Sequence, residues 1–416
     1  MKAGIGRVLG SSAVVAGAAL LAGALLGGAG AARAADEVVI GESTTLSGSI
    51  SELGETGRRG IQMLAERINA EGGLLGKKVR VVSADDGASP ANGVTNMRHM
   101  ILADKAVAIF GPVSSAVATA EESVAAQYHE LFFTHTSNDI KMTTSNFTKY
   151  YFQLVPNTVM EPRAPALFLA QRVGKGPITL GTITPDYSYG RDTVDAFIEA
   201  LRRDGVEVKV VVQQYPKLGA TDFTSYISAL LAARPQYVFM GIYGGDLITF
   251  TKQALNFDFF KKTKAITGYT RSPLKALDGQ APGGSYALGR APFWAVKGPG
   301  MKAFNRAYYA KYKDWPSAWA IMAYTAGQAW AYGVRKAASF DSDKVAAALG
   351  GATVPTIRGP LTLRACDHQA NVPEYVGVVA DAPDPRYGYP IWSQTEEIAA
   401  SKLMLTCEEV EKLRRR

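Results

Sequence analysis

Residues 107–124 read VAIFGPVSSAVATAEESV, which predicts a strand, a tight turn and a helix in direct succession. The apolar run 107–110 suits a strand buried on both faces, and the glycine and proline that follow end it. Ser114 and Ser115 then occupy the positions of a helix N-cap. Because a helix N-terminus carries unpaired N–H groups and partial positive charge, two hydroxyls beside it suit a carboxylate or another anion. The alternative is that both serines belong to a helix cap and nothing more.

The same alternation of short apolar runs and amphipathic helices continues on both sides of this segment. In the first part of the chain, further strands are predicted at 38–41, 78–83 and 131–133. A second unit of the same kind follows, with strands predicted at 178–183, 206–213, 237–240 and 265–267. Alternating strands and helices indicate an α/β fold with parallel sheets covered by helices on both faces.

Polar and aromatic residues gather where these strands end. They are Thr136, Ser137 and Asn138 in the first unit, and Tyr187, Tyr189, Tyr243 and Thr270 in the second. In open α/β sheets, ligands sit outside the carboxyl ends of the strands. Two such sheets that face one another would enclose a ligand between them. For the tyrosines, the alternative is ordinary packing.

The N-terminus predicts export. Lys2 and Arg7 precede an apolar run, and Ala32-Arg33-Ala34 supplies a small-x-small cleavage pattern. We therefore expect residues 1–35 to be a signal peptide cleaved near Ala34, and the mature protein to be periplasmic. No later stretch is long and apolar enough to span a bilayer.

Charge and cysteine content limit the classes of function that the chain can have. The net charge is +8, of which the predicted signal peptide supplies +3, and the rest is too diffuse to suggest nucleic-acid binding. Cys366 and Cys407 are the only cysteines in the 416 residues. In an oxidising compartment the two are expected to form a disulfide, and the alternative is two unpaired buried thiols.

The sequence lacks the motifs of exported enzymes. It contains no Gly-x-Ser-x-Gly nucleophile motif, no His-Glu-x-x-His zinc helix and no P-loop, and its four histidines share no metal-ligand spacing. Asp85-Asp86 could hold a metal, but it also suits a solvated strand end. His135 is the best candidate for a site histidine. We therefore expect binding without chemistry, without a metal and without a cofactor.

Several segments, taken in order, resemble one known family. Leu46-Ser47-Gly48, Ile68-Asn69-Ala70-Glu71-Gly72-Gly73-Leu74-Leu75-Gly76, Gly111 with Ser114-Ser115, and Asp186-Tyr187-Ser188-Tyr189-Gly190 are similar to type I periplasmic solute-binding proteins of ABC importers. The branch is that of the leucine-isoleucine-valine-binding protein. Together with Asp222-Phe223 and Gly359-Pro360-Leu361, the matches cover nearly the whole predicted mature chain.

This resemblance implies two Rossmann-like lobes, joined by three crossings, that close around a small molecule. The crossings are expected near Pro156, Ser285 and Arg358. Lobe 1 would then contain residues 36–156 and 285–358, and lobe 2 residues 157–284 and 359–416.

The resemblance also assigns roles to the candidate site residues. The ligand carboxylate is expected at Ser115 and at Ser137 with Asn138, and Tyr189 and Tyr243 are expected to cover the ligand. Thr270 stands where amino-acid binders of the family carry an acidic residue for the ligand ammonium. The expected ligand is therefore a small amino acid, carboxylate or amide with an apolar or aromatic body. Since a buried ammonium needs a charged partner, an amino acid is disfavoured unless Asp186 or Asp246 substitutes for the missing carboxylate.

The expected function is therefore that of a monomeric periplasmic binding protein that delivers one small solute to an ABC permease. One alternative is a ligand sensor that feeds a signalling or regulatory system. A further alternative, an exported hydrolase, would require Ser115 or another nucleophile with a base in reach.

Overall fold

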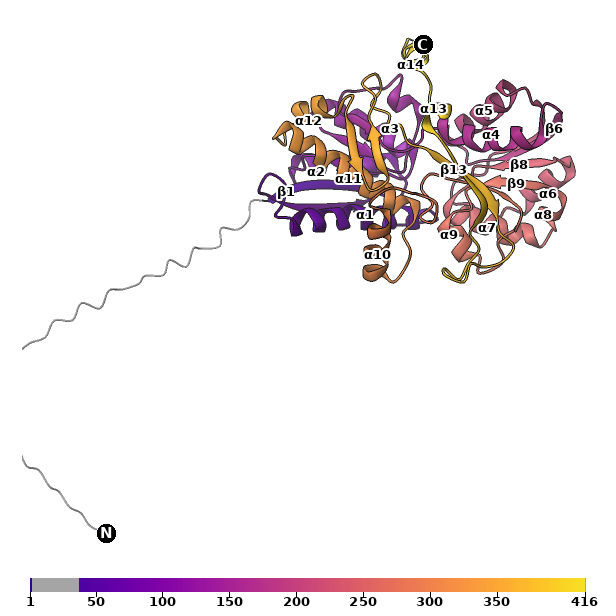
Figure 1. Cartoon of the computed structure of the whole chain (residues 1–416), viewed down its shortest axis with the longest axis horizontal. Helices are drawn as coiled ribbons and strands as arrows, with labels where there is room; N and C mark the ends of the chain where they lie inside the picture. Colours follow the sequence, from indigo (N-terminus) through magenta and orange to yellow (C-terminus); the bar gives the residue numbers. More distant parts are fainter. Residues whose placement is uncertain (2–36, 416) are drawn as a thin grey trace, which may run out of the picture. The chain divides into compact units, whose positions relative to one another are not determined.

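The computed structural model describes Met1 and residues 37–415, so the predicted signal peptide, apart from Met1, and its cleavage point lie outside the described residues. The first sheet has five strands, all parallel, in the order β2-β1-β3-β4-β5 (Figure 1). Its strands are β1 (Glu37–Thr44), β2 (Lys78–Asp85), β3 (Ile109–Phe110), β4 (Phe132–Thr134) and β5 (Tyr151–Gln153).

The second sheet has seven strands in the order β14-β13-β10-β9-β8-β6-β7. They are β6 (Pro177–Ile183), β7 (Glu207–Gln214), β8 (Tyr237–Met240), β9 (Lys264–Thr267), β10 (Tyr286–Gly289), β13 (Glu374–Val379) and β14 (Trp392–Ile398). The first five in chain order run parallel to one another, whereas β13 and β14 are antiparallel additions at one edge. The predicted α/β fold with two Rossmann-like lobes is confirmed.

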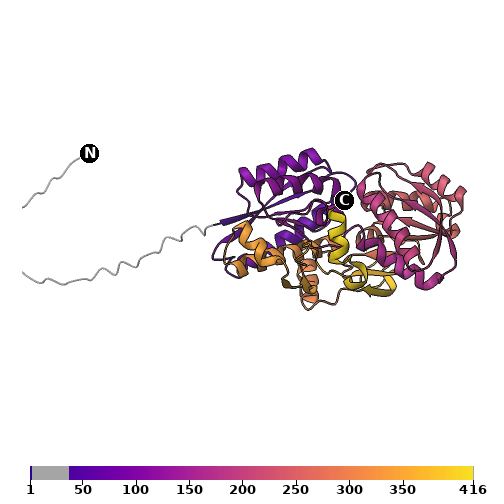
Figure 2. The same cartoon turned by 90° about the horizontal axis from the view of Figure 1, so that it is seen from above.

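Helices lie on both faces of each sheet (Figures 1 and 2). The first lobe has α1 (Ser51–Ala70), α2 (Pro90–Leu102), α3 (Ser115–Tyr128), α10 (Met301–Tyr312), α11 (Ala318–Ala337) and α12 (Ser342–Leu349), together with the 3₁₀ turn η1 (Ile140–Thr143) and the hairpin β11 (Thr353–Thr356)–β12 (Gly359–Thr362). The second lobe has α4 (Met160–Val173), α5 (Ser188–Arg203), α6 (Thr224–Ala233), α7 (Gly244–Leu255), α8 (Phe259–Lys262) and α9 (Arg271–Ala276). Within residues 37–415, no helix combines the length and hydrophobicity needed to cross a membrane.

Helix α1 shows how the sequence builds the core of the first lobe. Ile61, Leu64 and Ile68 recur at helical spacing and are buried. Their face packs against α11, and the two backbones approach closely because glycines lie at the contact. A Cβ on Gly60 would lie 2.3 Å from the carbonyl oxygen of Ala320, so no larger residue fits there.

Two crossings between the sheets differ from their predicted places. Ser285 is followed by β10, which still pairs with β9 of the second sheet. Arg358 is followed by β12, which pairs with β11, and by a bridge between Gln153 of β5 and Gln369. The chain therefore leaves the second sheet after Gly289 and returns to it at Glu374. Strand pairing between distant segments decides where both crossings lie. Gly359-Pro360 interrupts the sequence pattern, but the chain does not pass from one lobe to the other there.

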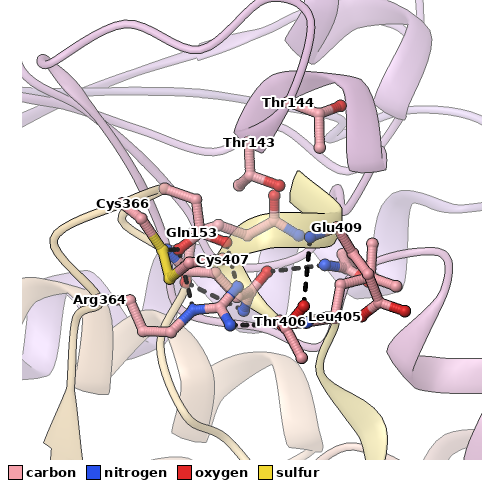
Figure 3. Close-up of polar contacts among 12 residues, drawn as sticks. Thr143, Thr144, Gln153, Arg364, Cys366, Leu405, Thr406, Cys407 and Glu409 are labelled. Carbon is pink, nitrogen blue, oxygen red and sulfur yellow. Dashed lines mark hydrogen bonds and ion pairs between the residues drawn. A yellow bond between two sulfur atoms is a disulfide. The ribbon is translucent and has the colours of Figure 1, made fainter. Parts of the chain in front are cut away.

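The C-terminal segment returns to the first lobe. After β14 come α13 (Ala400–Leu403) and α14 (Cys407–Arg414), and Cys407 forms a disulfide with Cys366 (Figure 3). Beside the disulfide, Arg364 Nη1 donates to the carbonyl oxygen of Leu405 at 2.5 Å, and Arg414 Nη2 donates to that of Thr143 at 3.3 Å. Residues 359–416 were predicted to lie wholly in lobe 2, but these contacts attach α14 to first-lobe segments.

We predict that the double variant Cys366→Ser/Cys407→Ser is less stable than the wild type. The bridge closes a loop with a sequence separation of 41, and the chain-entropy model gives about 4 kcal/mol for a loop of that size as an upper estimate. Urea unfolding of the variant, and of the wild type with and without reductant, measures the loss. Equal midpoints for all of these samples would contradict it.

Helix α3 also buries carboxyl groups. Glu122 is 2% exposed, and neither of its carboxyl oxygens has a hydrogen-bond partner among the described residues. Burial, aided by the nearby charge of Asp139, raises the pKa of Glu122 to about 9. The folded protein therefore keeps a proton on Glu122 at a pH where the unfolded chain has lost it.

This protonation predicts that stability falls as pH rises. Between about pH 4.5 and 9 the native state holds the Glu122 proton and the unfolded state does not, so Glu122 lowers the free energy of unfolding by about 1.4 kcal/mol per pH unit. Glu122→Gln should remove this contribution from the slope of unfolding free energy against pH. Glu207→Gln, at an exposed position, is the control and should leave the slope unchanged.

Candidate ligand-binding site

A cavity of about 490 Å³ lies between the loops that follow the strands of the two sheets. The first sheet contributes the starts of α1 and α3 and the loop after β4. The second contributes the residues after β6, β8, β9 and β10. The carboxyl ends of both sheets therefore face one shared cavity, as expected for ligand sites in α/β proteins.

Seven of the predicted site residues line this cavity and two do not. Those that line it are Ser115, Thr136, Asn138, Tyr187, Tyr189, Tyr243 and Thr270. Ser114 and Ser137 are buried beside it. Ser114 occupies the N-cap position of α3 but makes no capping bond with its side chain, and the Ser137 backbone N–H donates to the carbonyl oxygen of Pro112 at 3.1 Å.

The first-lobe wall presents hydroxyls at the start of α3. Ser115 is the first residue of that helix, and its Oγ accepts a hydrogen bond from the backbone N–H of Asn138 at 3.3 Å. This bond fixes the loop after β4 against the helix, so that Thr136 lines the same wall. A helix N-terminus with two adjacent hydroxyls can bind a carboxylate.

A buried ion pair that sequence reasoning missed lines the cavity. Arg290 follows β10 and is 5% exposed, and Glu161 is in the first turn of α4. Arg290 Nη2 and Nε lie 2.8 Å and 3.2 Å from the two carboxylate oxygens of Glu161, and its Nη1 donates to the carbonyl oxygen of Thr136. The only sequence signal was a single charge inside the apolar run 286–296.

Three tyrosines of the second lobe form one wall. The hydroxyls of Tyr187 and Tyr243 are 2.7 Å apart, and the ring of Tyr189 lies 5.9 Å from Tyr187 and 5.6 Å from Tyr243. Burial raises the pKa of all three hydroxyls, with smaller effects from neighbouring tyrosines and carboxylates. At neutral pH they are therefore neutral, and the wall suits an apolar or aromatic ligand body.

Sequence reasoning also missed a second group of charged residues that line the cavity. Arg271, the first residue of α9, contacts Glu52 of α1 at 3.0 Å and also pairs with Asp314 from the α10–α11 loop. Lys275 lies 2.8 Å from Asp314, and Ser272 Oγ donates to Glu52 at 2.7 Å. Burial raises the pKa of Glu52, although the Ser272 hydrogen bond and the charge of Arg271 lower it in part. No motif signalled this group, because its members come from separate parts of the chain.

The other acidic candidates do not reach the cavity. Asp186 pairs with Arg191 near the surface, and Asp246 accepts a hydrogen bond from the backbone N–H of Gly219 at 2.8 Å. Neither lines the cavity. The proposed substitution of either carboxylate for the one missing at Thr270 is therefore not supported by their positions.

His135 and the aspartate pair have structural surroundings. His135 is fully buried with Nδ1 at 2.9 Å from Thr136 Oγ1 and Nε2 at 3.6 Å from Glu42, and it does not line the cavity. Asp85 accepts from the backbone N–H of Leu46, and Asp86 from the hydroxyl of Thr45. Both aspartates thus hold the loop that leads from β1 to α1.

The family model described as "Periplasmic binding protein" matches residues 37–383. The chain therefore belongs to the periplasmic binding protein family, whose members bind solutes and are not enzymes. It is 26% identical over 338 residues to a leucine-, isoleucine-, valine-, threonine- and alanine-binding protein of Pseudomonas aeruginosa, with 81% of this chain and 88% of that protein covered.

Solved structures share the fold at lower identity. A periplasmic binding protein from Burkholderia mallei superposes with a TM-score of 0.80 at 21% identity, covering 90% of this chain and 98% of the other. A solute-binding protein of an ABC transporter from Rhodopseudomonas palustris, solved in complex with 3,4-dihydroxybenzoic acid, gives 0.76 at 21% identity, covering 88% and 98%.

We predict that Arg290→Met destabilises the protein by about 3–5 kcal/mol, because it leaves Glu161 charged, buried and without its cation. The double variant Arg290→Met/Glu161→Gln should recover part of the loss. Arg191→Met is the matched control, since it breaks an exposed pair with Asp186 and should cost at most about 1 kcal/mol. Urea unfolding measures all three, and an equal loss for Arg290→Met and Arg191→Met would contradict the role of Arg290.

Proposed function

We propose that this chain is the binding component of an ABC importer, and that it holds one small carboxylate with an apolar or aromatic body in the cavity. It acts as a monomer in the periplasm, after cleavage near Ala34, and delivers its ligand to a permease of the inner membrane. The observation that carries the proposal is the cavity itself, which is lined by the carboxyl ends of two separate sheets.

The first-lobe wall supports a carboxylate as the ligand group. Ser115, Thr136 and the start of α3 supply hydroxyls and helix N–H groups on one side of the cavity. Arg290 is nearby but is already neutralised by Glu161. The first-lobe wall therefore offers hydrogen-bond donors to an anion but no unpaired positive charge. Anion sites at helix N-termini have this arrangement.

The absence of an acidic side chain at Thr270 argues against an α-amino acid. Glu161, which lines the cavity, accepts hydrogen bonds from Arg290 at both carboxylate oxygens and from Asn138 at one of them. An ammonium placed beside Thr270 would meet a hydroxyl instead of a carboxylate, and burying such an ion without a charged partner is costly.

Contacts between the loops of the two sheets favour a closed state. The backbone N–H of Gly245 donates to the carbonyl oxygen of Ser49 at 2.8 Å, and Ser188 Oγ donates to Asp139 at 2.9 Å. Each bond joins a second-lobe helix N-terminus to a first-lobe loop. A ligand that bridges both walls would stabilise the state in which these bonds form, and a permease could recognise that state.

A thermal-shift screen tests this function. The purified exported protein is heated with branched-chain and aromatic amino acids, aromatic and aliphatic carboxylates, short dicarboxylates and amides. A ligand at 100 times its Kd adds about 2.7 kcal/mol to stability, so carboxylates without an amine should raise the Tm. Ser115→Ala should weaken binding of the best ligand about tenfold, as expected for one lost hydrogen bond to a charged group. A rise with amino acids alone would contradict the proposed ligand class.

A further inference from the structure

Five glycines line the cavity, and close packing explains four of them. The five are Gly241, Gly244, Gly245, Gly268 and Gly289. A Cβ on Gly241 or Gly289 would lie 2.7 Å or 2.6 Å from a threonine methyl carbon. A Cβ on Gly244 or Gly245 would lie 3.1 Å or 2.8 Å from the carbonyl oxygen of Ser49. A larger residue at any of these four positions would force its neighbours to move.

Gly268 is the exception. It follows β9 and is half-buried, and a Cβ built on it would meet no heavy atom of the described residues within 4 Å, apart from its two neighbours in the chain. Its φ lies outside the left-handed region that favours glycine. Neither packing nor backbone conformation therefore requires a glycine here. Because Gly268 lines the cavity, a side chain at this position would take up cavity volume.

The space beside Gly268 is not a result of separated lobes. The two lobes already touch around the cavity, where Arg271 lies 3.0 Å from Glu52 and the backbone N–H of Gly245 donates to the carbonyl oxygen of Ser49 at 2.8 Å. With these contacts in place, the described part of the first lobe still has no atom within 4 Å of the Cβ position of Gly268. The space therefore remains when the lobes are in contact.

The cavity is larger than a carboxylate with one benzene ring needs. Its volume of about 490 Å³ lies within the range of roughly 300–1,000 Å³ that is typical of clefts for drug-sized ligands. A single-ring acid is smaller than such a ligand, so part of the cavity wall would have no ligand atoms in contact with it. Wall atoms without partners lose dispersion contacts. A ligand that fills the cavity therefore has a larger body.

The walls that such a body would contact are apolar and aromatic. Tyr187, Tyr189, Tyr243, Ile248 and Trp319 line the cavity, and each of them is partly exposed. Their accessible surfaces can pack against a flat aromatic ligand. Two fused or linked rings bury more apolar area than one ring, and affinity rises with the apolar area removed from water.

We propose that Gly268 is a specificity-determining residue, whose missing side chain admits carboxylates with an extended aromatic body such as two fused or linked rings. The inference rests on the proposed function, because it assumes that the ligand is a carboxylate. A side chain at this position would fill the space that the second ring occupies. The variant protein would then lose its preference for the larger ligand.

Isothermal titration with rigid probes tests the inference. The probes are benzoate, 2-naphthoate and biphenyl-4-carboxylate, which share the carboxylate and differ in the aromatic body. At least one of the two larger compounds should bind the wild type about tenfold more tightly than benzoate, because it buries more apolar surface. In Gly268→Leu this ratio should fall to near one, and Gly268→Ala should give an intermediate ratio.

Two other glycines supply the controls. Gly176→Leu places the same side chain at an exposed glycine outside the cavity lining, where the nearest atom to a Cβ is 3.9 Å away, and it should leave all affinities unchanged. Gly289→Ala should lower the Tm of the unliganded protein because its Cβ collides with a neighbour, whereas Gly268→Ala should keep the wild-type Tm. Since the readout is a ratio of affinities, a general loss of lobe closure in Gly268→Leu cancels.

Each other outcome overturns a defined part. Wild-type affinities that are equal for benzoate and both larger probes overturn the inference but leave the carboxylate function standing. A ratio in Gly268→Leu that matches the wild type shows that the second ring lies elsewhere in the cavity, which also overturns the role of Gly268. If none of these carboxylates binds and only amino acids do, the proposed function fails and the inference fails with it.

Discussion

The buried contact between Arg290 and Glu161 ties together the parts of the molecule on which the cavity depends. Arg290 follows the last parallel strand of the second sheet, and Glu161 lies in the first turn of the first helix after the chain leaves the first sheet. The Arg290 guanidinium also donates to the carbonyl oxygen of Thr136. Arg358 donates in turn to the carbonyl oxygen of Arg290 at 3.0 Å. Segments from two crossings and from the β11–β12 turn thus meet at one buried charge, whose hydrogen bonds would be costly to break singly.

Two kinds of electrostatic contact then surround the cavity. In one group, the Arg290–Glu161 pair is buried beside the hydroxyl wall, and the Glu161 carboxylate neutralises the positive charge of Arg290. In a second group, Arg271 of the second lobe contacts Glu52 and Asp314 of the first, so ions of both lobes meet beside the cavity. The tyrosine wall is neutral. The cavity is therefore lined by two groups of paired charges together with apolar and aromatic side chains, and a few polar groups of this kind can fix the orientation of a small ligand.

The sequence predicted elements whose signal is local, and it missed those that depend on distant partners. Helix α1 follows from the spacing of Ile61, Leu64 and Ile68, and α3 from the break at Gly111-Pro112. In contrast, β10 and β14 were not predicted, because their pairing with β13 is antiparallel and long-range. The misplacement of the crossings at Ser285 and Arg358 has the same cause.

The residues of the candidate site show the same difference between local and long-range signals. Ser115, Thr136, Asn138 and the tyrosines could be predicted because each follows a recognisable strand, and the carboxyl ends of parallel strands share one edge of a sheet. Glu52, Glu161, Arg271, Arg290 and Asp314 could not, because a charged residue looks the same in sequence whether it is solvated or paired in a cavity. By itself the sequence determined the α/β class, the family and the strand-end residues, since these rest on local periodicity and motif order. Only the tertiary structure decided which charges are buried and which carboxylate oxygens lack a partner among the described residues, because pairing and desolvation depend on what lies next to a side chain in space.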